Sequence, residues 1–184
     1  MKRKTNKVKK NKAVNSQPKV TTKLLLRRLE SDNSLTREAA ARHRNASQRV
    51  LLKALEDWNK YVRATAAENP NATQEVLLKA LRDHSNNVRA AAAGNPNASR
   101  GILLMALEDM DKEVCVIAAG NPSASQEVLL RALRDMNSCV RRAAIENPSA
   151  TLKVLSEALS KDRETLIAAA QKAIRRLRKL SKQN

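Results

Sequence analysis

The chain has 184 residues, with 36 lysines and arginines against 18 aspartates and glutamates, and so a formal net charge of +18. It contains no phenylalanine, one tryptophan and one tyrosine, which excludes an aromatic core and an array of aromatic side chains for stacking the bases of single-stranded nucleic acid. No stretch alternates apolar with polar residues as a half-buried strand does, and glycine and proline are scarce. We therefore expect an all-α protein.

The first segment, residues 1–16, is basic and nearly free of apolar side chains. Residues 1–20 hold eight basic residues and no acidic one, so this segment cannot bury enough apolar surface to fold alone, and we expect it to be disordered. Such a tail usually meets a polyanion; targeting to the nucleus or solubility is the alternative. Its composition is similar to that of ribosomal-protein extensions that thread into RNA. The residues expected to contact phosphate are Lys2, Arg3, Lys4, Lys7, Lys9, Lys10 and Lys12.

An Asn-Pro pair then recurs every 26 residues, with its asparagine at 69, 95, 121 and 147. Two further steps back by 26 reach His43 and Gln17, where the downstream pattern continues. Self-similarity at a fixed period is typical of stacked repeats. We expect six units and number positions from the first residue of each: unit 1 to unit 6 are 17–42, 43–68, 69–94, 95–120, 121–146 and 147–172.

Each unit reads as a pair of helices. Position 5 is always serine or threonine, which can cap a helix start, and apolar residues follow at positions 8, 9 and 13, as in Val76, Leu77 and Leu81. This spacing predicts a first helix of about ten residues with one buried stripe. A polar stretch then leads to an alanine-rich second helix, which the next Asn-Pro ends because the residue before proline avoids the α region.

The unit Asn-Pro-x-Ala-(Ser/Thr)-x-x-Val-Leu-Leu-x-Ala-Leu-x-Asp-x-x-x-x-Val-Arg-x-Ala-Ala resembles the leucine-rich repeat variant family and, more broadly, HEAT-like repeats. The resemblance covers about residues 17–172, and residues 69–94 and 121–146 match best. It implies a right-handed α-solenoid of six helix-pair repeats, with a basic N-terminal tail and a C-terminal capping helix. It implies little about function.

HEAT repeats often carry an aspartate and an arginine six positions apart that bond along the stack. The resemblance therefore implies a structural role for three such pairs, with binding of a ligand by their arginines as the alternative. In unit 4, Asp109 would face Cys115, so one rung would be broken. The three pairs are Asp57/Arg63, Asp83/Arg89 and Asp135/Arg141.

Nothing in the sequence assembles a catalytic centre. There is no nucleophile with a base, no cluster of metal ligands and no glycine-rich phosphate loop, so we expect no enzyme, no cofactor and no metal. Cys115 and Cys139 are expected to be free thiols in a reducing compartment. No segment is apolar enough to span a membrane, and the N-terminus lacks the apolar region of a secretory signal. We expect an intracellular, cytoplasmic protein, or a nuclear or organellar one in a eukaryote.

Two columns of the repeat are candidate binding surfaces. Position 11 is basic in four units, at Arg27, Lys53, Lys79 and Arg131, and is either a phosphate track or a solvated, salt-bridged helix face. Position 16 lies in the turn between the helices and includes Trp58, Met110 and Met136. These side chains either anchor a protein partner or pack over the neighbouring turn.

The last helix, about residues 165–181, has an apolar side and a strongly basic remainder, which continues through residues 173–184. We expect it to cap the solenoid and to contribute phosphate contacts; association with an anionic membrane surface is a weaker alternative. The candidate contacts are Arg175, Arg176, Arg178 and Lys179.

Together these features predict a non-catalytic binding module that docks on nucleic acid, with RNA or a ribonucleoprotein ahead of DNA. The contacts would be to phosphate and therefore sensitive to salt. A scaffold for an acidic protein partner is the alternative. The sequence does not predict an oligomeric state.

Overall fold

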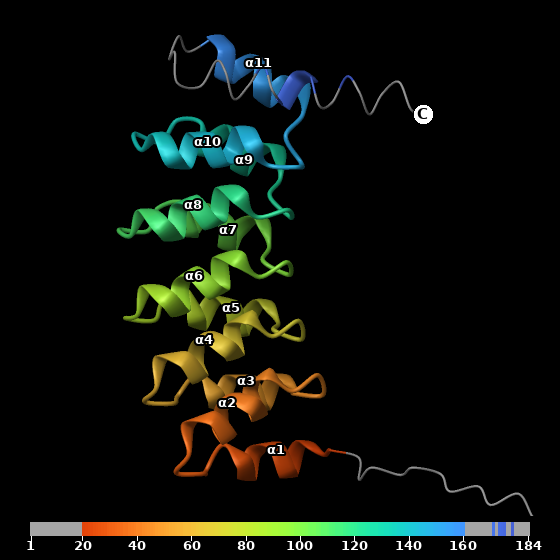
Figure 1. Cartoon of the computed structure of the whole chain (residues 1–184), viewed down its shortest axis with the longest axis vertical. Helices are drawn as coiled ribbons and strands as arrows, with labels where there is room; N and C mark the ends of the chain where they lie inside the picture. The colour runs from red at the N-terminus through yellow and green to blue at the C-terminus, as the bar shows by residue number, and fades with distance from the viewer. Residues whose placement is uncertain (1–19, 161–170, 172, 176–177, 179–184) are drawn as a thin grey trace, which may run out of the picture.

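A computed structural model describes residues 20–160, 171, 173–175 and 178 (Figure 1). Within those residues the structure is all helical and contains no strand. First helices and second helices alternate along the chain. The first helices are α1 (Thr22–Arg28), α3 (Gln48–Ala54), α5 (Gln74–Ala80), α7 (Arg100–Ala106), α9 (Gln126–Ala132) and α11 (Leu152–Ser160); the second helices are α2 (Ser34–Arg42), α4 (Lys60–Glu68), α6 (Asn86–Gly94), α8 (Lys112–Gly120) and α10 (Ser138–Glu146).

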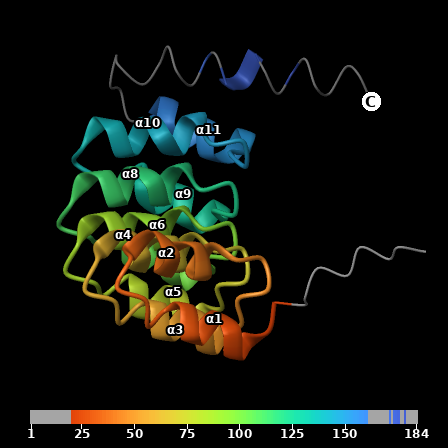
Figure 2. The same ribbon diagram turned by 60° about the horizontal axis from the view of Figure 1, so that its bottom comes forward.

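The helix pairs stack on one another in chain order to form an α-solenoid (Figures 1 and 2). Each first helix packs on its own second helix and on the first helix of the next pair, while the second helices form a layer of their own. Helix starts recur at the predicted 26-residue interval, as in α3, α5, α7 and α9. The all-α solenoid predicted from the repeat is thus confirmed.

Five of the first helices, α1, α3, α5, α7 and α9, are shorter than the predicted ten residues. Each has seven helical residues and is capped by a leucine in the αR region, such as Leu55 with φ −69° and ψ −7°. The chain then tightens, because the next two amides bond three residues back: Glu56 N–H to Lys53 O at 3.1 Å and Asp57 N–H to Ala54 O at 3.2 Å. This narrow turn places position 15 beside the start of the second helix.

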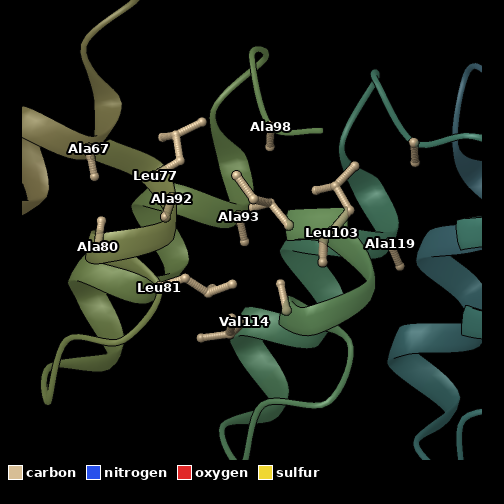
Figure 3. Close-up of a cluster of buried hydrophobic side chains, with 14 of the residues drawn as sticks. Ala67, Leu77, Ala80, Leu81, Ala92, Ala93, Ala98, Leu103, Val114 and Ala119 are labelled. Carbon is tan, nitrogen blue, oxygen red and sulfur yellow. The ribbon is translucent and has the colours of Figure 1, made fainter. Parts of the chain in front are cut away.

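The core consists of aliphatic side chains repeated once per unit. Position 9 is a leucine that is fully buried in every unit, and burial of each such leucine contributes about 1.5–3 kcal/mol relative to exposure. Alanines of the second helices, such as Ala92, Ala93 and Ala119, let neighbouring pairs approach closely around Leu103 and Val114 (Figure 3). The position-9 leucines are Leu25, Leu51, Leu77, Leu103, Leu129 and Leu155.

Side chains cap most helix starts. Thr21, Thr73, Ser99 and Ser125 each accept a hydrogen bond from the amide three residues on, as predicted for position 5. Ser47 makes no such bond. The second helices are capped from position 17, which the sequence reading missed. There Asn33, Asn59, Asp111 and Asn137 accept from the amide two residues on.

The asparagine of each Asn-Pro pair does more than end a helix. It has extended backbone, as the following proline requires, with φ −61° and ψ 127° at Asn121. Its side chain is buried and joins its own unit to the two before it: Asn121 Nδ2 donates to Ala93 O at 2.7 Å and to Asn95 O at 3.0 Å, and its Oδ1 accepts from Ser123 N–H at 2.8 Å. Asn69, Asn95 and Asn147 repeat this arrangement. We call this set the asparagine ladder.

Candidate binding surfaces

In units 1 to 3, the arginine at position 21 joins its unit to the next through a second set of contacts, the arginine ladder. Arg63 Nε and Nη2 donate to the Asp83 carboxylate at 2.7 and 3.0 Å, and Nη1 donates to Asp57 O and Trp58 O at 2.8 and 3.1 Å. Arg37 with Asp57 and Arg89 with Asp109 repeat this geometry. Every donor nitrogen of each of these guanidinium groups is therefore engaged within the fold.

Burial raises the pKa of Asp83, but the hydrogen bond from Arg63, the Ser85 amide and the Arg63 charge outweigh it, so the pKa lies below its ordinary value. The pKa of Asp109 is lowered against its burial in the same way by Arg89. The ladder thus keeps its carboxylates ionised in a site where side-chain exposure is 10% or less for both of these aspartates.

The prediction that each arginine pairs with the aspartate six residues earlier, in its own unit, is wrong. An arginine bonds the aspartate 20 residues later, in the following unit, and reaches only the backbone carbonyl of the aspartate six residues earlier. Asp109, which was expected to face Cys115, is bonded by Arg89 instead. Because unit 4 has Cys115 in place of this arginine, the ion pair that it lacks is the one to Asp135 in unit 5.

Cys115 stands where the ladder has arginine elsewhere. Its buried thiol lies 3.3 Å from Asp109 O and 3.5 Å from Leu107 O and Asp111 O, and burial raises its pKa above the ordinary value. The acceptors of a regular rung, Asp109 O, Met110 O and the Asp135 carboxylate, are all present in the sequence of this unit and the next.

Replacing Cys115 by arginine is expected to raise the free energy of unfolding by about 1–3 kcal/mol, because one charged hydrogen-bonded contact between units is restored. Thermal melting followed by circular dichroism measures the change, with Cys115→Ser as the control that alters the thiol without adding a guanidinium. A melting temperature for Cys115→Arg below that of the natural chain would contradict the expectation.

The basic column at position 11 is exposed and largely paired with acids. Lys53 and Lys79 both lie 3.2 Å from the Glu56 carboxylate, and Arg131 lies 3.8 Å from Glu108. Ion pairs between exposed groups are weak, so they leave these side chains able to exchange partners. The use of Arg27, Lys53, Lys79 and Arg131 as a phosphate track stays a prediction.

At the N-terminal end, positions 7 and 11 are both basic in two successive units. Lys23 and Arg27 are one helical turn apart on α1, and Arg49 and Lys53 occupy the same positions on α3. Because equal positions of successive units stack, these four exposed side chains share one face. We call them the basic quartet. Of the four, only Lys53 forms an ion pair with a described residue.

Arg28 extends the basic surface around the end of the stack. It occupies position 12, which is a buried alanine in each later unit, and it is exposed because no described helix packs against that side of α1. Position 7, which is basic in units 1 and 2, is a glutamate in units 3 and 5, Glu75 and Glu127. Basic residues at both position 7 and position 11 therefore occur only in the first two units.

The turn residues at position 16 point into solvent. Trp58 is 78% exposed, Met110 94% and Met136 96%, so the alternative in which these side chains pack over the neighbouring turn is wrong for the two methionines. Trp58 has one contact of note, since the Arg37 guanidinium carbon lies 4.9 Å from the centre of its ring. Protein binding by Trp58, Met110 and Met136 stays a prediction.

Most of the predicted tail contacts lie outside the described residues: Lys2, Arg3, Lys4, Lys7, Lys9, Lys10, Lys12, Arg176 and Lys179. Arg175 and Arg178 are described and exposed. Beside them Ala173 is buried and Ile174 packs against the core, which places an apolar side of this segment against the solenoid.

Both cysteines are free thiols, with Cys115 buried and Cys139 exposed. Within the described part of the chain, no group of three histidine, cysteine, aspartate or glutamate side chains is arranged to hold a metal ion. The helices described there are also too short or too polar to cross a membrane.

No protein-family model matches the sequence, and no curated protein matches it. Among solved structures, the chain is similar to a leucine-rich repeat variant described as having a novel repetitive structural motif. The two are 21% identical, the match covers 84% of this chain and 72% of the other, and the TM-score is 0.36. By its own helices the chain is an α-helical repeat protein of solenoid form.

Proposed function

We propose that this α-solenoid is a binding module that docks on nucleic acid through its N-terminal end, with structured RNA or a ribonucleoprotein ahead of DNA. The observation that carries the proposal is the basic quartet with Arg28, a surface of exposed cations on rigid helices. Phosphate contacts from such a surface fix the position of a nucleic acid without reading its sequence.

The distribution of charge along the chain supports this end over the other. Residues 1–53 hold 16 basic and 3 acidic residues, a net charge of +13, whereas residues 54–184 hold 20 and 15, a net charge of +5. The basic segment that precedes Val20 joins the solenoid at α1, beside the quartet. The basic residues of this segment and those of the quartet are therefore supplied to the same region, which raises the local potential toward a polyanion.

The scarcity of aromatic residues sets the mode of binding. Trp58 and Tyr61 are the only aromatic side chains of the chain, and both lie in unit 2. Binding is then driven by phosphate neutralisation and release of counterions, which weakens steeply with salt. Double-helical segments present phosphates at regular spacing, so they suit a rigid surface of this kind better than unstacked bases do.

Replacing Arg27 and Arg49 by glutamine is expected to reduce the slope of log affinity against log salt by about 1.4–1.8, because two phosphate contacts are lost. Fluorescence anisotropy with labelled structured RNA and duplex DNA, at about 50 and 200 mM salt, measures the slope. The matched control is Arg131→Gln with Lys153→Gln, which removes the same charge from positions 11 and 7 of later units.

Equal losses in the two double variants would show a diffuse attraction and would sink the assignment to the N-terminal end. Glutamine in place of the seven basic residues between Lys2 and Lys12 tests the tail in the full chain. Absence of binding to either nucleic acid at low salt would refute the proposal. A search for the acidic protein partner in nuclease-treated pull-downs would follow.

A further inference from the structure

A hollow of about 370 Å³ lies on the layer of second helices, between α6 and α8. Its floor is apolar: Ala90, Ala91 and Gly94 of α6 face Val114 and Ile117 of α8. Its size falls in the lower part of the range that small ligands and single side chains occupy in proteins.

Small residues at three positions open the hollow. Positions 22, 23 and 26 are Ala90, Ala91 and Gly94 in unit 3, whereas unit 5 places Arg142 and Glu146 at positions 22 and 26. The missing side chain of Gly94 also permits close approach of the two helices, since an added Cβ would lie 3.3 Å from Ile117 Cγ2. The apolar floor therefore depends on residues that are particular to units 3 and 4.

The rim of the hollow is acidic. Glu68, Asp111 and Glu113 line it, and no lysine, arginine or histidine does. The hydrogen bond from the Asn86 side chain, followed by that from the Glu113 amide, lowers the pKa of Asp111 below its ordinary value and keeps it ionised. Glu68 and Glu113 form no ion pair with any residue in the described ranges.

The surroundings of the hollow are negative although the chain is strongly positive. Residues 54–130 hold 7 basic and 10 acidic residues, a net charge of −3. The basic quartet lies two units away, about 20 Å at the usual spacing of packed helices, which is roughly twice the Debye length at physiological salt. Two cations lie close to the rim: Lys60, whose Nζ lies 3.4 Å from Asn87 Oδ1, and Arg89, whose charge helps to lower the pKa of Asp111.

We propose that this hollow binds a lysine or arginine side chain presented by a basic peptide segment of a partner protein. The aliphatic stem would lie on Ala90, Ala91 and Ile117, and the cationic head would reach Glu68 and Glu113 at the rim. A long side chain that is apolar along its stem and charged at its tip matches a hollow with an apolar floor and an anionic rim. The site is distinct in place and in sign of charge from the nucleic-acid surface.

The test uses the full chain and a short fluorescein-labelled peptide of alternating lysine and alanine, followed by anisotropy. Glu68→Gln with Glu113→Gln is expected to weaken binding by about tenfold or more. Glu30→Gln with Glu146→Gln, which removes the same charge outside the hollow, is expected to change it less than about twofold. Ala90→Leu keeps every carboxylate but fills the floor, and it is expected to weaken binding as well.

Equal effects of the two glutamine pairs, or undiminished binding by Ala90→Leu, would overturn the proposal, because attraction would then be diffuse. Binding that appears only after glutamine replaces the seven basic residues between Lys2 and Lys12 would also overturn it, since the occupant would then be the chain's own segment. The Glu68, Glu113 and Ala90 variants leave the basic quartet and the tail unchanged, so their effect on peptide binding is judged separately from nucleic-acid binding.

Discussion

Replacing Arg63 by alanine is expected to lower the free energy of unfolding by about 3–5 kcal/mol, because it leaves the Asp83 carboxylate without its guanidinium partner in a nearly buried site. The substitution also strips the Asp57 and Trp58 carbonyls of their donor. Urea unfolding followed by circular dichroism measures the loss. Arg63→Lys is expected to recover only part of it, since an ammonium group cannot make the two parallel bonds to a carboxylate.

Two controls isolate the ladder contact. Arg82→Ala removes an exposed arginine from the neighbouring turn and is expected to cost less than about 0.5 kcal/mol. In the double variant Arg63→Ala with Asp83→Asn, the loss should be smaller than the sum of the single losses. Additive losses, or a loss from Arg63→Ala within the range of the Arg82 control, would show that the contact contributes little.

The same contact makes stability depend on pH. The folded pKa of Asp83 lies below its ordinary value, so the unfolded chain binds this proton more readily than the folded one. The contribution is fully present above the unfolded pKa and is lost as pH falls through the lower, folded pKa. Arg63→Ala should therefore flatten the acid limb of the stability curve, relative to Arg82→Ala.

Replacing Asn121 by alanine is expected to lower the free energy of unfolding by about 2–4 kcal/mol, because it removes two buried hydrogen bonds and a partly buried one at once. The Ala93 and Asn95 carbonyls lose a donor, and the Ser123 amide loses an acceptor. Unsatisfied polar groups in a buried site cost about 1–3 kcal/mol each, partly relieved where water can enter. Thermal and urea unfolding of the full chain measure the loss.

Ser123→Ala is the matched control. Ser123 Oγ donates to Pro96 O at 2.6 Å, but this bond is exposed, so water can replace it and the expected cost is about 1 kcal/mol or less. Asn121→Asp should destabilise more than alanine at neutral pH, because a carboxylate would face two carbonyl oxygens. If Asn121→Ala proves no more damaging than Ser123→Ala, the ladder is not a stabilising element.

The 26-residue period and the all-α solenoid could be predicted from the sequence, whereas the partners of the polar residues could not. Periodicity shows that aspartate and arginine share a register, but in a periodic chain a separation of 6 and one of 20 describe the same two columns. Arg37 held the one clue that decides between them: its own unit has Ser31 at position 15, while the next unit has Asp57. Because unit 1 has the arginine but no aspartate at position 15, its arginine can pair only with the aspartate of the following unit.

The asparagine ladder was hidden for a different reason. Any residue before proline tends to end a helix, so the Asn-Pro pairs had a sufficient local explanation. The residue before the proline is asparagine in all four Asn-Pro pairs. A helix end alone does not require an amide side chain, so this repetition was a signal of a further role. The hollow between α6 and α8 could not have been predicted at all, since it depends on how far two helices approach.

The two ladders also bear on how the chain reaches its structure. In the described residues the hydrogen bonds between units span 20 to 28 residues of sequence, as in Arg63 with Asp83 and Asn121 with Ala93. Contacts so local in sequence close short loops and are associated with fast folding. On a nascent chain that emerges from the ribosome, each unit can therefore form its arginine-ladder contact as soon as the next unit has been synthesised. Synthesis itself can lay down the stack in order, from α1 onward.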